Sequence, residues 1–281
     1  MNQDGGAVMV VKCGGNPAVD TDAICRDIAG LTRAGRAVVL VHGGSADIDA
    51  LAARLGVPQR IQVAPDGVAA RRTDAATLEV VTLALAGLVK PRLVAALSRH
   101  GTTGVGLTGI DGGLLRARRK APQRALIDGR LILVRDSHAG TVHHVETGLL
   151  AALLDRGIVP VVSPPALCDD GRAVNVNADR AAAAIAAALR AELFLLTGAP
   201  GVLADPADEA SVHDAVELAA TGPPPRAAAG GMALKLIAAR EALAGGATRV
   251  RIADGRVARP VHAALAGAGT EVTLRLREVA G

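Results

Sequence analysis

Aromatic side chains are almost absent from this sequence of 281 residues, which contains one phenylalanine, Phe194, and neither tryptophan nor tyrosine. Half of the residues are hydrophobic, so a large core is possible, but alanine, valine, leucine and isoleucine must build it. Proteins that bind single-stranded nucleic acids depend on aromatic rings on which bases stack, and the scarcity of rings argues against a nucleic-acid partner. A bound nucleobase would have to lie on aliphatic walls and hydrogen-bond to the backbone.

Features of a secreted or membrane-anchored protein are also missing. The three cysteines, Cys13, Cys25 and Cys168, form no CxxC pair, which indicates a reducing compartment without structural disulfides or a zinc site. The first residues show neither the basic stretch nor the long apolar stretch of a signal peptide. The longest apolar run, residues 181–189, is too short to span a bilayer. The sequence therefore predicts a cytoplasmic protein without a membrane partner.

Lysine is scarce as well: of the 31 basic residues only four are lysines, Lys12, Lys90, Lys120 and Lys235. Lysine carries its charge on a compact ammonium group, and arginine on a broad planar guanidinium group. A lysine retained among so many arginines therefore indicates a site that a guanidinium does not fit. Lys12 and Lys235 each stand close to a pair of glycines, as in phosphate-binding sites. Chance or ordinary packing remains the alternative. The net charge of +4 is mild and fits either an anionic ligand or an ordinary mixed surface.

Short apolar runs alternate with longer helical stretches along the chain. The apolar runs predict strands over residues 8–11, 37–41, 103–107, 158–162, 193–196, 249–252 and 271–274. The helical stretches cover residues 18–34, 45–55, 73–88, 91–98, 146–156, 178–191, 213–219, 232–244 and 257–266. Fully apolar strands that alternate with helices predict an α/β protein, with a mainly parallel sheet covered by helices on both faces in a three-layer αβα sandwich.

Several boundary signals accompany these elements. Ser45 is a predicted N-cap, and Thr73 or Asp74 is predicted to cap the helix that follows it. Residues 114–117 and 131–134 are predicted to form a hairpin-like excursion. Residues 221–229, rich in proline and alanine, are predicted to be a linker close to a site.

Two pairs of glycines follow the first two predicted strands. Gly14-Gly15 comes after the first strand, and Gly43-Gly44 comes after the second. Because ligands of open α/β sheets bind at the carboxyl ends of strands, both pairs are predicted at one edge, where their N–H groups can approach an anion. Neither glycine pair belongs to a Walker A motif or to a GxGxxG motif. His42, before the second pair, is interpreted as a structural residue rather than as a base.

Three further elements follow in the second half of the chain. Residues 175–179 contain Asn175, Asn177 and Asp179 before an alanine-rich helix, and this aspartate could hold two lysines, although capping alone would explain Asn177 or Asp179. Residues 195–203 run from a strand into a glycine-rich turn that suits a nucleotide seat made of backbone. Gly231 and Lys235 lie at the start of a helix.

Taken in this order, the five elements resemble the amino acid kinase family, in its acetylglutamate kinase branch, over about residues 8–272. Residues 42–46, 109–112, 138–142 and 254–257 with Pro260 are more similar to the [LysW]-aminoadipate kinases, which act on substrates attached to an amino-group carrier protein. The resemblance implies the amino acid kinase fold with two lobes, residues 1–163 for acidic-substrate binding and dimerisation and residues 164–281 for ATP binding. About seven residues precede the first strand, where arginine-inhibited hexameric relatives have an extra helix, so a homodimer is expected.

The resemblance also implies roles for individual residues. Lys12 and Lys235 would stabilise the transferring phosphoryl group, and Asp179 would position both. The residues that would hold the acidic substrate are Gly43, Gly44, Arg71 and Asn175. The residues that would hold ATP, which carries Mg²⁺ with it, are Gly14, Gly15, Thr197, Gly198, Pro200, Gly201, Leu203 and Gly231. No residue is expected to bind a metal directly. Gly198 departs from the aspartate or asparagine of relatives, and Arg71 has the alternative of a surface ion pair with Asp74.

The implied reaction is the ATP-dependent phosphorylation of a side-chain carboxylate to an acyl phosphate, on an aminoadipate- or glutamate-type amino acid whose amino group is attached to a small acidic carrier protein. A carboxylate with a pKa of about 4 is already ionised at neutral pH and needs no general base. The alternatives are a free N-acetyl-L-glutamate kinase of arginine biosynthesis and, less favoured, a non-catalytic amino-acid-sensing module. The basic run 116–124 is interpreted either as a docking surface for the carrier or as a solvated hairpin.

Overall fold

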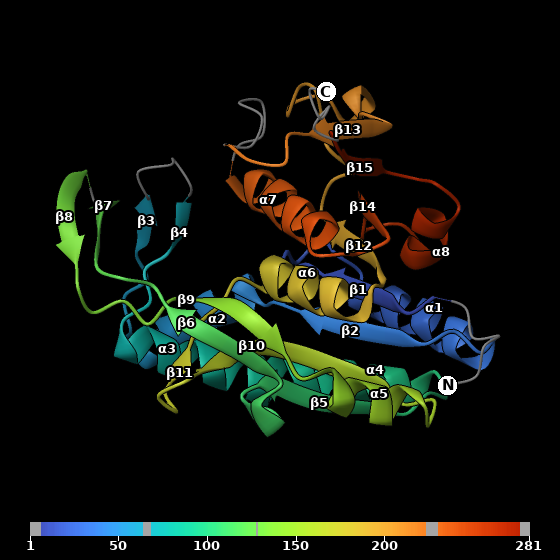
Figure 1. The fold of residues 1–281 in the computed structure, drawn as a ribbon, viewed down its shortest axis with the longest axis horizontal. Helices are drawn as coiled ribbons and strands as arrows, with labels where there is room; N and C mark the ends of the chain where they lie inside the picture. Colours follow the sequence, from blue (N-terminus) through green and yellow to red (C-terminus); the bar gives the residue numbers. More distant parts are fainter. Residues whose placement is uncertain (1–6, 64–68, 128, 223–229, 276–281) are drawn as a thin grey trace, which may run out of the picture.

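The computed structural model describes residues 7–63, 69–127, 129–222 and 230–275. Within these residues, an 11-stranded mixed sheet crosses the molecule, with helices on both faces (Figure 1). The strands along its main path, in spatial order, are β13 (Ala215–Leu218), β15 (Thr270–Leu274), β14 (Arg249–Asp254), β12 (Glu192–Thr197), β1 (Met9–Cys13), β2 (Val38–His42), β10 (Val159–Cys168), β6 (Leu115–Arg119) and β9 (Gly140–Val145). The two others, β5 (Gly104–Gly109) and β11 (Ala173–Val174), pair with β10.

Most strand pairs of the large sheet are parallel, as the alternation of strands and helices predicts. The antiparallel pairs are β14 with β15, β6 with β9, and β10 with β11. β1 pairs with β2 on one side and with β12, from the second half of the chain, on the other. The two predicted lobes therefore share one continuous sheet, and their boundary remains a prediction.

Side chains of β1 alternate between the two faces of the sheet. Val10 lies in the core under α5 (Thr147–Leu154), α6 (Ala178–Leu189) and α7 (Gly230–Ala244). Met9 and Val11 lie in the opposite core, which packs against α1 (Thr21–Arg33), α4 (Lys90–Arg99) and α8 (Pro260–Leu265). Phe194 is fully buried in this second core. The predicted three-layer αβα arrangement is confirmed.

A smaller antiparallel sheet stands apart from the large one (Figure 1) and has the order β4 (Ala69–Arg71), β3 (Ile61–Val63), β7 (Gln123–Ile127) and β8 (Arg130–Val134). The predicted excursion from residues 114–117 to 131–134 is wrong as a hairpin, because β6 belongs to the large sheet. β8 instead turns back on β7 at Gly129, whose φ of +76° suits glycine. The partner of β8 is therefore β7, residues 123–127, and the sequence patterns did not predict this strand.

One long helix contains α3 (Ala75–Thr82), the π-helical segment η1 (Leu83–Val89) and α4. The predicted helix with Pro91 in its first turn is confirmed as α4, but the predicted break before it is wrong, because the helix is continuous. Proline lacks an N–H group and crowds the carbonyl four residues earlier, and the wider π-helical turn spans these residues. By length and composition alone this 25-residue helix could cross a membrane. It packs instead against α1, α2 (Ser45–Leu55) and β10, as a core helix does.

Two other local predictions fail, and one is confirmed. Residues 215–218 form strand β13, not a helix, because pairing with β15 overrides local propensity. Ser45 is the first residue of α2 rather than its N-cap, which is Gly44. Asp74 is the N-cap of α3 and accepts a hydrogen bond from Thr77 N at 2.9 Å. The predicted linker lies largely outside the described residues.

Candidate active site

A cavity of about 440 Å³ opens where β1, β2 and β12 end beside the first turns of α6 and α7. It brings together most of the residues that the sequence predicted for the site. The predicted residues in its lining are Lys12, Gly14, Gly15, Gly43, Gly44, Arg71, Asn175, Asp179, Thr197, Gly231 and Lys235.

Asp179 lies between the two lysines near the predicted glycine loops. Its Oδ1 lies 2.7 Å from Lys12 Nζ, and its Oδ2 lies 3.3 Å from Lys235 Nζ. All three residues are buried, with 4%, 5% and 9% of Lys12, Asp179 and Lys235 exposed. Burial alone would raise the pKa of Asp179, but the two ammonium groups outweigh it and hold that pKa below its ordinary value. Burial lowers the pKa of Lys235, and Asp179 opposes this shift.

Local structure explains how these three side chains meet. Lys12 is two residues after Val10 on β1, so it points to the face covered by α6 and α7. Asp179 lies in the first turn of α6, where the helix dipole favours a carboxylate, and Asn177 caps that helix by accepting from Arg180 N at 3.1 Å. Lys235 lies in the second turn of α7. The site therefore joins elements that are far apart in the sequence.

The two glycine loops touch one another, as the shared sheet edge predicts. A Cβ atom on Gly15 would lie 2.4 Å from Ser45 N, and one on Gly44 would lie 2.8 Å from the side chain of Leu85. The hydroxyl of Ser45 donates to Gly15 O at 3.2 Å. Gly15 thus requires glycine because backbone atoms approach it too closely for a side chain, whereas at Gly44 the ends of side chains such as that of Leu85 would have to move.

His42 is fully buried behind the glycine loop and does not line the cavity. Its Nδ1 lies 3.0 Å from Gly43 O, and among the described residues its Nε2 has no hydrogen-bond partner. Burial lowers the pKa of His42 to about 4, so the ring is neutral at neutral pH. The geometry agrees with the structural interpretation.

Arg71, the last residue of β4 in the small sheet, and Asn175, which follows β11 of the large sheet, both line the cavity. Arg71 Nη1 lies 2.7 Å from Asp49 Oδ1 and also donates to Gln59. Asp74, the partner in the alternative interpretation, is occupied as a helix cap. Asn175 Nδ2 donates to Thr73 Oγ1 at 3.2 Å.

Four residues of the predicted nucleotide seat, Gly198, Pro200, Gly201 and Leu203, lie outside the lining of this cavity. A Cβ atom on Gly201 would lie 2.6 Å from Thr270 Oγ1, which gives this glycine a packing role. A Cβ atom on Gly198 would lie 2.6 Å from Asn16 Nδ2, so Asn16 stands beside the turn. Their contact with ATP remains a prediction.

Sequence reasoning missed several lining residues. Asn16 directly follows Gly14-Gly15, and this position could have signalled it. Ile48 and Leu85 are apolar residues of helical segments, where an apolar side chain usually means packing, so no local signal marked them. Of the described residues that line the cavity, only Asp179 is acidic, and it is already paired with two lysines.

The chain belongs to the amino acid kinase family, whose sequence model matches residues 7–254. A [LysW]-aminoadipate kinase of Deinococcus radiodurans is 42% identical over 95% of this chain and 91% of the relative. One from Thermus thermophilus is 39% identical over 94% of this chain and its own full length. An acetylglutamate kinase of Methanocella arvoryzae is 38% identical over 96% of this chain and 91% of the relative.

Solved structures agree with this assignment of the fold. N-acetylglutamate synthase from Neisseria gonorrhoeae superposes with a TM-score of 0.74 at 26% identity, and the match covers 98% of this chain but only 61% of the synthase. Giardia carbamate kinase superposes with a TM-score of 0.65 at 16% identity, over 96% of this chain and 99% of that one. The second likeness concerns the fold alone.

Proposed function

We propose that this protein transfers a phosphoryl group from ATP to a side-chain carboxylate, giving an acyl phosphate and ADP. The observation that carries the proposal is the buried arrangement of Lys12, Asp179 and Lys235 in the lining of the cavity, which two glycine loops also line. Phosphoryl transfer depends on positioning and on electrostatic stabilisation more than on covalent chemistry by the protein. Membership in the amino acid kinase family supports it.

The chemistry asked of these residues is modest. The carboxylate nucleophile is ionised already, so no general base is required, and none of the site residues is assigned that role. Lys12 and Lys235 offset the repulsion between the anionic nucleophile and the anionic phosphate, and Asp179 holds both ammonium groups in place. N–H groups of Gly14, Gly15, Gly43 and Gly44 supply further donors.

In this scheme Mg²⁺ enters the site bound to the phosphates of ATP. Mg²⁺ prefers several oxygen ligands and usually combines one or two carboxylates with substrate phosphates. Because Asp179 is already paired with two lysines, the phosphates of ATP would supply the ligands, and the bound ion would add charge neutralisation. The described residues contain no cluster of three or more candidate metal ligands.

The substrate we propose is an aminoadipate- or glutamate-type residue attached through its amino group to a small acidic carrier protein. Support comes from the names of the two relatives above and from the segments that resemble carrier-dependent kinases. Arg71 would pair with a substrate carboxylate, since a planar fork suits that contact. In the same scheme residues 1–163 bind this substrate and residues 164–281 bind ATP.

The basic run is a candidate docking surface for such a carrier. Arg118, Arg119, Lys120 and Arg124 are exposed, and Arg116 is half-buried. The run is not a hairpin, because β6 and β7 belong to different sheets. A positive surface would attract an acidic partner and guide its docking.

A trapping assay tests the activity and its substrate together. Acyl phosphates react with hydroxylamine, so hydroxamate formation is measured with carrier-linked aminoadipate, carrier-linked glutamate and N-acetyl-L-glutamate. Faster turnover of a carrier-linked substrate is the expected result. Faster turnover of N-acetyl-L-glutamate would favour the alternative, a kinase that acts on the free amino acid derivative. The 38% identity to an acetylglutamate kinase supports testing this alternative. No ATP turnover with any carboxylate would contradict the proposal and favour the amino-acid-sensing module.

Two further properties belong to this proposal. A homodimer is expected from the family resemblance, and sedimentation equilibrium would measure it. A cytoplasmic location is expected for a biosynthetic enzyme of this kind that uses ATP, and fractionation of cells that express the full chain would test it.

A further inference from the structure

The helices that carry Asp179 and Lys235 pack together, and most of the side chains that each of them buries are alanines. The buried residues of α6 besides Asp179 and Ile185 are Ala181, Ala182, Ala183 and Ala186. Those of α7 besides Lys235 and Leu236 are Ala233, Ala238, Ala239 and Ala242. The two helices pack directly on one another, side by side in Figure 1. Methyl groups interlock little, so these alanines specify the axial position of α7 on α6 only weakly.

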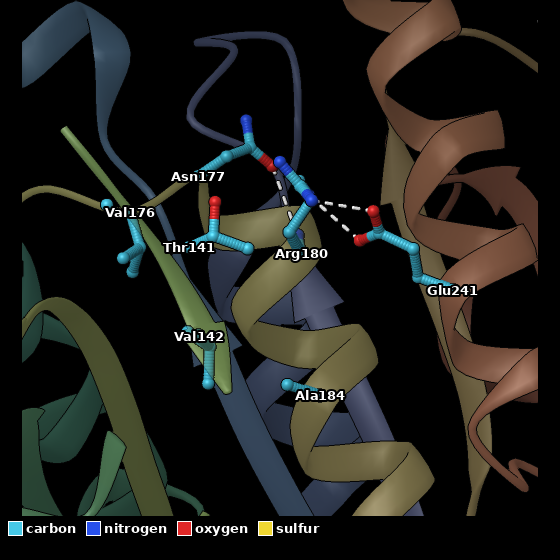
Figure 2. A pocket seen from close by; sticks show the side chains of 8 residues that line it. Thr141, Val142, Val176, Asn177, Arg180, Ala184 and Glu241 are labelled. Carbon is cyan, nitrogen blue, oxygen red and sulfur yellow. Dashed lines mark hydrogen bonds and ion pairs between the residues drawn. The ribbon is translucent and has the colours of Figure 1, made fainter. Parts of the chain in front are cut away.

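A second polar contact joins the same two helices. Arg180, the residue after Asp179, places Nε 2.8 Å from Glu241 Oε2 and Nη2 2.6 Å from Glu241 Oε1 (Figure 2). Such a two-point contact between planar groups restricts both distance and orientation. Both side chains are partly exposed, 27% for Arg180 and 38% for Glu241, so the pair contributes little to folding as such.

A cavity of about 320 Å³ flanks this pair (Figure 2). It is bounded by Thr141 and Val142 of β9 and by Ala184 of α6, as well as by the pair itself. Within the described residues, the guanidinium of Arg180 forms its hydrogen bonds with Glu241 alone. The position of Arg180 is therefore determined by Glu241 rather than by tight packing on the cavity side.

The Arg180–Glu241 pair lies on the same two helices as Asp179 and Lys235, and only a few residues away from them. Glu241 follows Lys235 by six residues, roughly 9 Å along α7. A slip of α7 by one residue, about 1.5 Å, would carry Lys235 Nζ away from the Asp179 oxygen that it meets at 3.3 Å. Lys12 is unaffected by such a slip, because it comes from β1 and already lies 2.7 Å from Asp179.

We infer that Arg180 and Glu241 are positioning residues that hold α7 in register on α6, so that Lys235 reaches Asp179 and the transferring group. Polar pairs that specify register are well known in helix assemblies with otherwise permissive packing. The inference rests on the proposed function, in which Lys235 acts on the phosphoryl group.

A double-mutant cycle on kcat tests the inference. Glu241→Gln and Arg180→Met each lower kcat about tenfold and change KM for ATP less than about twofold, because the misplaced group acts mainly in the transition state. The double variant also loses about tenfold, since either change alone already breaks the pair. The matched control is Arg36→Met, which breaks a single ion pair to Glu192 (2.9 Å) at the start of β12, the end of the sheet away from the cavity, and keeps kcat within about twofold.

Three outcomes would overturn the inference: single variants with unchanged kcat, an additive loss of about a hundredfold in the double variant, or the same loss in Arg36→Met. If the unmutated protein forms no acyl phosphate at all, the proposed function fails. The register of α7 on α6 is then tested without an activity assay, by a crystal structure of Glu241→Gln. Separation of Lys235 Nζ from Asp179 beyond about 4 Å supports the positioning role, and an unchanged contact contradicts it.

Discussion

The two sheets of this protein bury their side chains to very different degrees. Strands β1 and β2 of the large sheet are buried at every position, including those of Lys12 and His42. In the small sheet Leu126, Leu131 and Leu133 are 45%, 62% and 47% exposed. The large sheet thus holds charges at defined distances, whereas the small sheet presents an apolar surface beside exposed arginines.

This difference separates two tasks within one chain. Charges act strongly at short range only where water is excluded, which the buried end of the large sheet provides. Contiguous exposed apolar surface with a polar rim is typical of binding sites for other proteins. Chemistry and stability are therefore expected from the large sheet, and recognition of a carrier from the region around the small one.

Truncation of one leucine in each sheet should show the largest contrast. Leu195→Ala in β12 removes a fully buried side chain and is expected to lower the free energy of unfolding by about 2–5 kcal/mol. Leu133→Ala in β8 is expected to cost less than about 0.5 kcal/mol, because nearly half of that side chain is exposed. Urea unfolding measures both. A similar loss at the two positions would mean that the small sheet is covered in solution.

Replacement of either site lysine by arginine should lower kcat by at least about 100-fold, the scale for removing one charge-stabilising group. The guanidinium of Lys12→Arg or Lys235→Arg keeps the charge but is too broad for the space beside Asp179. Steady-state kinetics measure the effect. Lys120→Arg, exposed in the basic run, is the matched control and keeps kcat within about twofold. Near-normal turnover of either site variant would contradict the roles assigned to these lysines.

Substitutions of Asp179 distinguish an orienting role from other roles. Asp179→Asn retains one acceptor oxygen and the side-chain shape, and is expected to lower kcat about tenfold, whereas Asp179→Ala loses more. Both variants are compared by kcat at saturating ATP. Equal losses in the two variants would argue against Asp179 as an orienter.

As pH rises, turnover should fall at a lower pH than it would if Lys235 had the ordinary pKa of a lysine. The pKa of Lys235 is lowered from 10.5 by burial, so its charged form is present below the shifted pKa and is lost as pH rises through it. A kcat profile from neutral pH upward measures this limb. In Lys235→Arg the residual turnover should lack the limb, and an unchanged midpoint there would assign it to another group.

Charge removal beside the small sheet should give the smallest effect. Arg124→Ser in β7 is expected to weaken carrier binding a few-fold and to reduce its dependence on salt, while turnover of a free carboxylate stays unchanged. Calorimetric titration at two salt concentrations measures the binding. Carrier binding that does not weaken with salt would count against docking through the basic run.

Most elements of the large sheet follow from local patterns, and most errors lie elsewhere. Apolar runs such as those of β1 and β12 could be recognised because both of their faces are buried. The local pattern of β13 favours a helix instead, because a short strand with exposed positions carries a weak strand pattern. The local pattern does not reveal β7, because its five residues begin with two polar ones, Gln123 and Arg124, and leave only a short apolar run.

The site was predictable in its residues but not in all of its contacts. Glycine pairs beside scarce lysines marked Lys12 and Lys235, and helix capping marked the segment of Asp179. The ion pair of Arg71 with Asp49 and the contact of Leu85 with Gly44 were not predictable, since each joins segments without any shared sequence pattern.

Sequence periodicity and strand-end glycines were sufficient to specify a mainly parallel α/β fold and the edge of the sheet at which an anion would bind, because these depend on local spacing and backbone geometry. Folding was needed to bring Lys12 and Lys235 to opposite oxygens of Asp179, at 2.7 and 3.3 Å, from β1 and from α7. Those distances depend on how α6 and α7 pack on the sheet, and no pattern within either helix encodes its axial position on its neighbour.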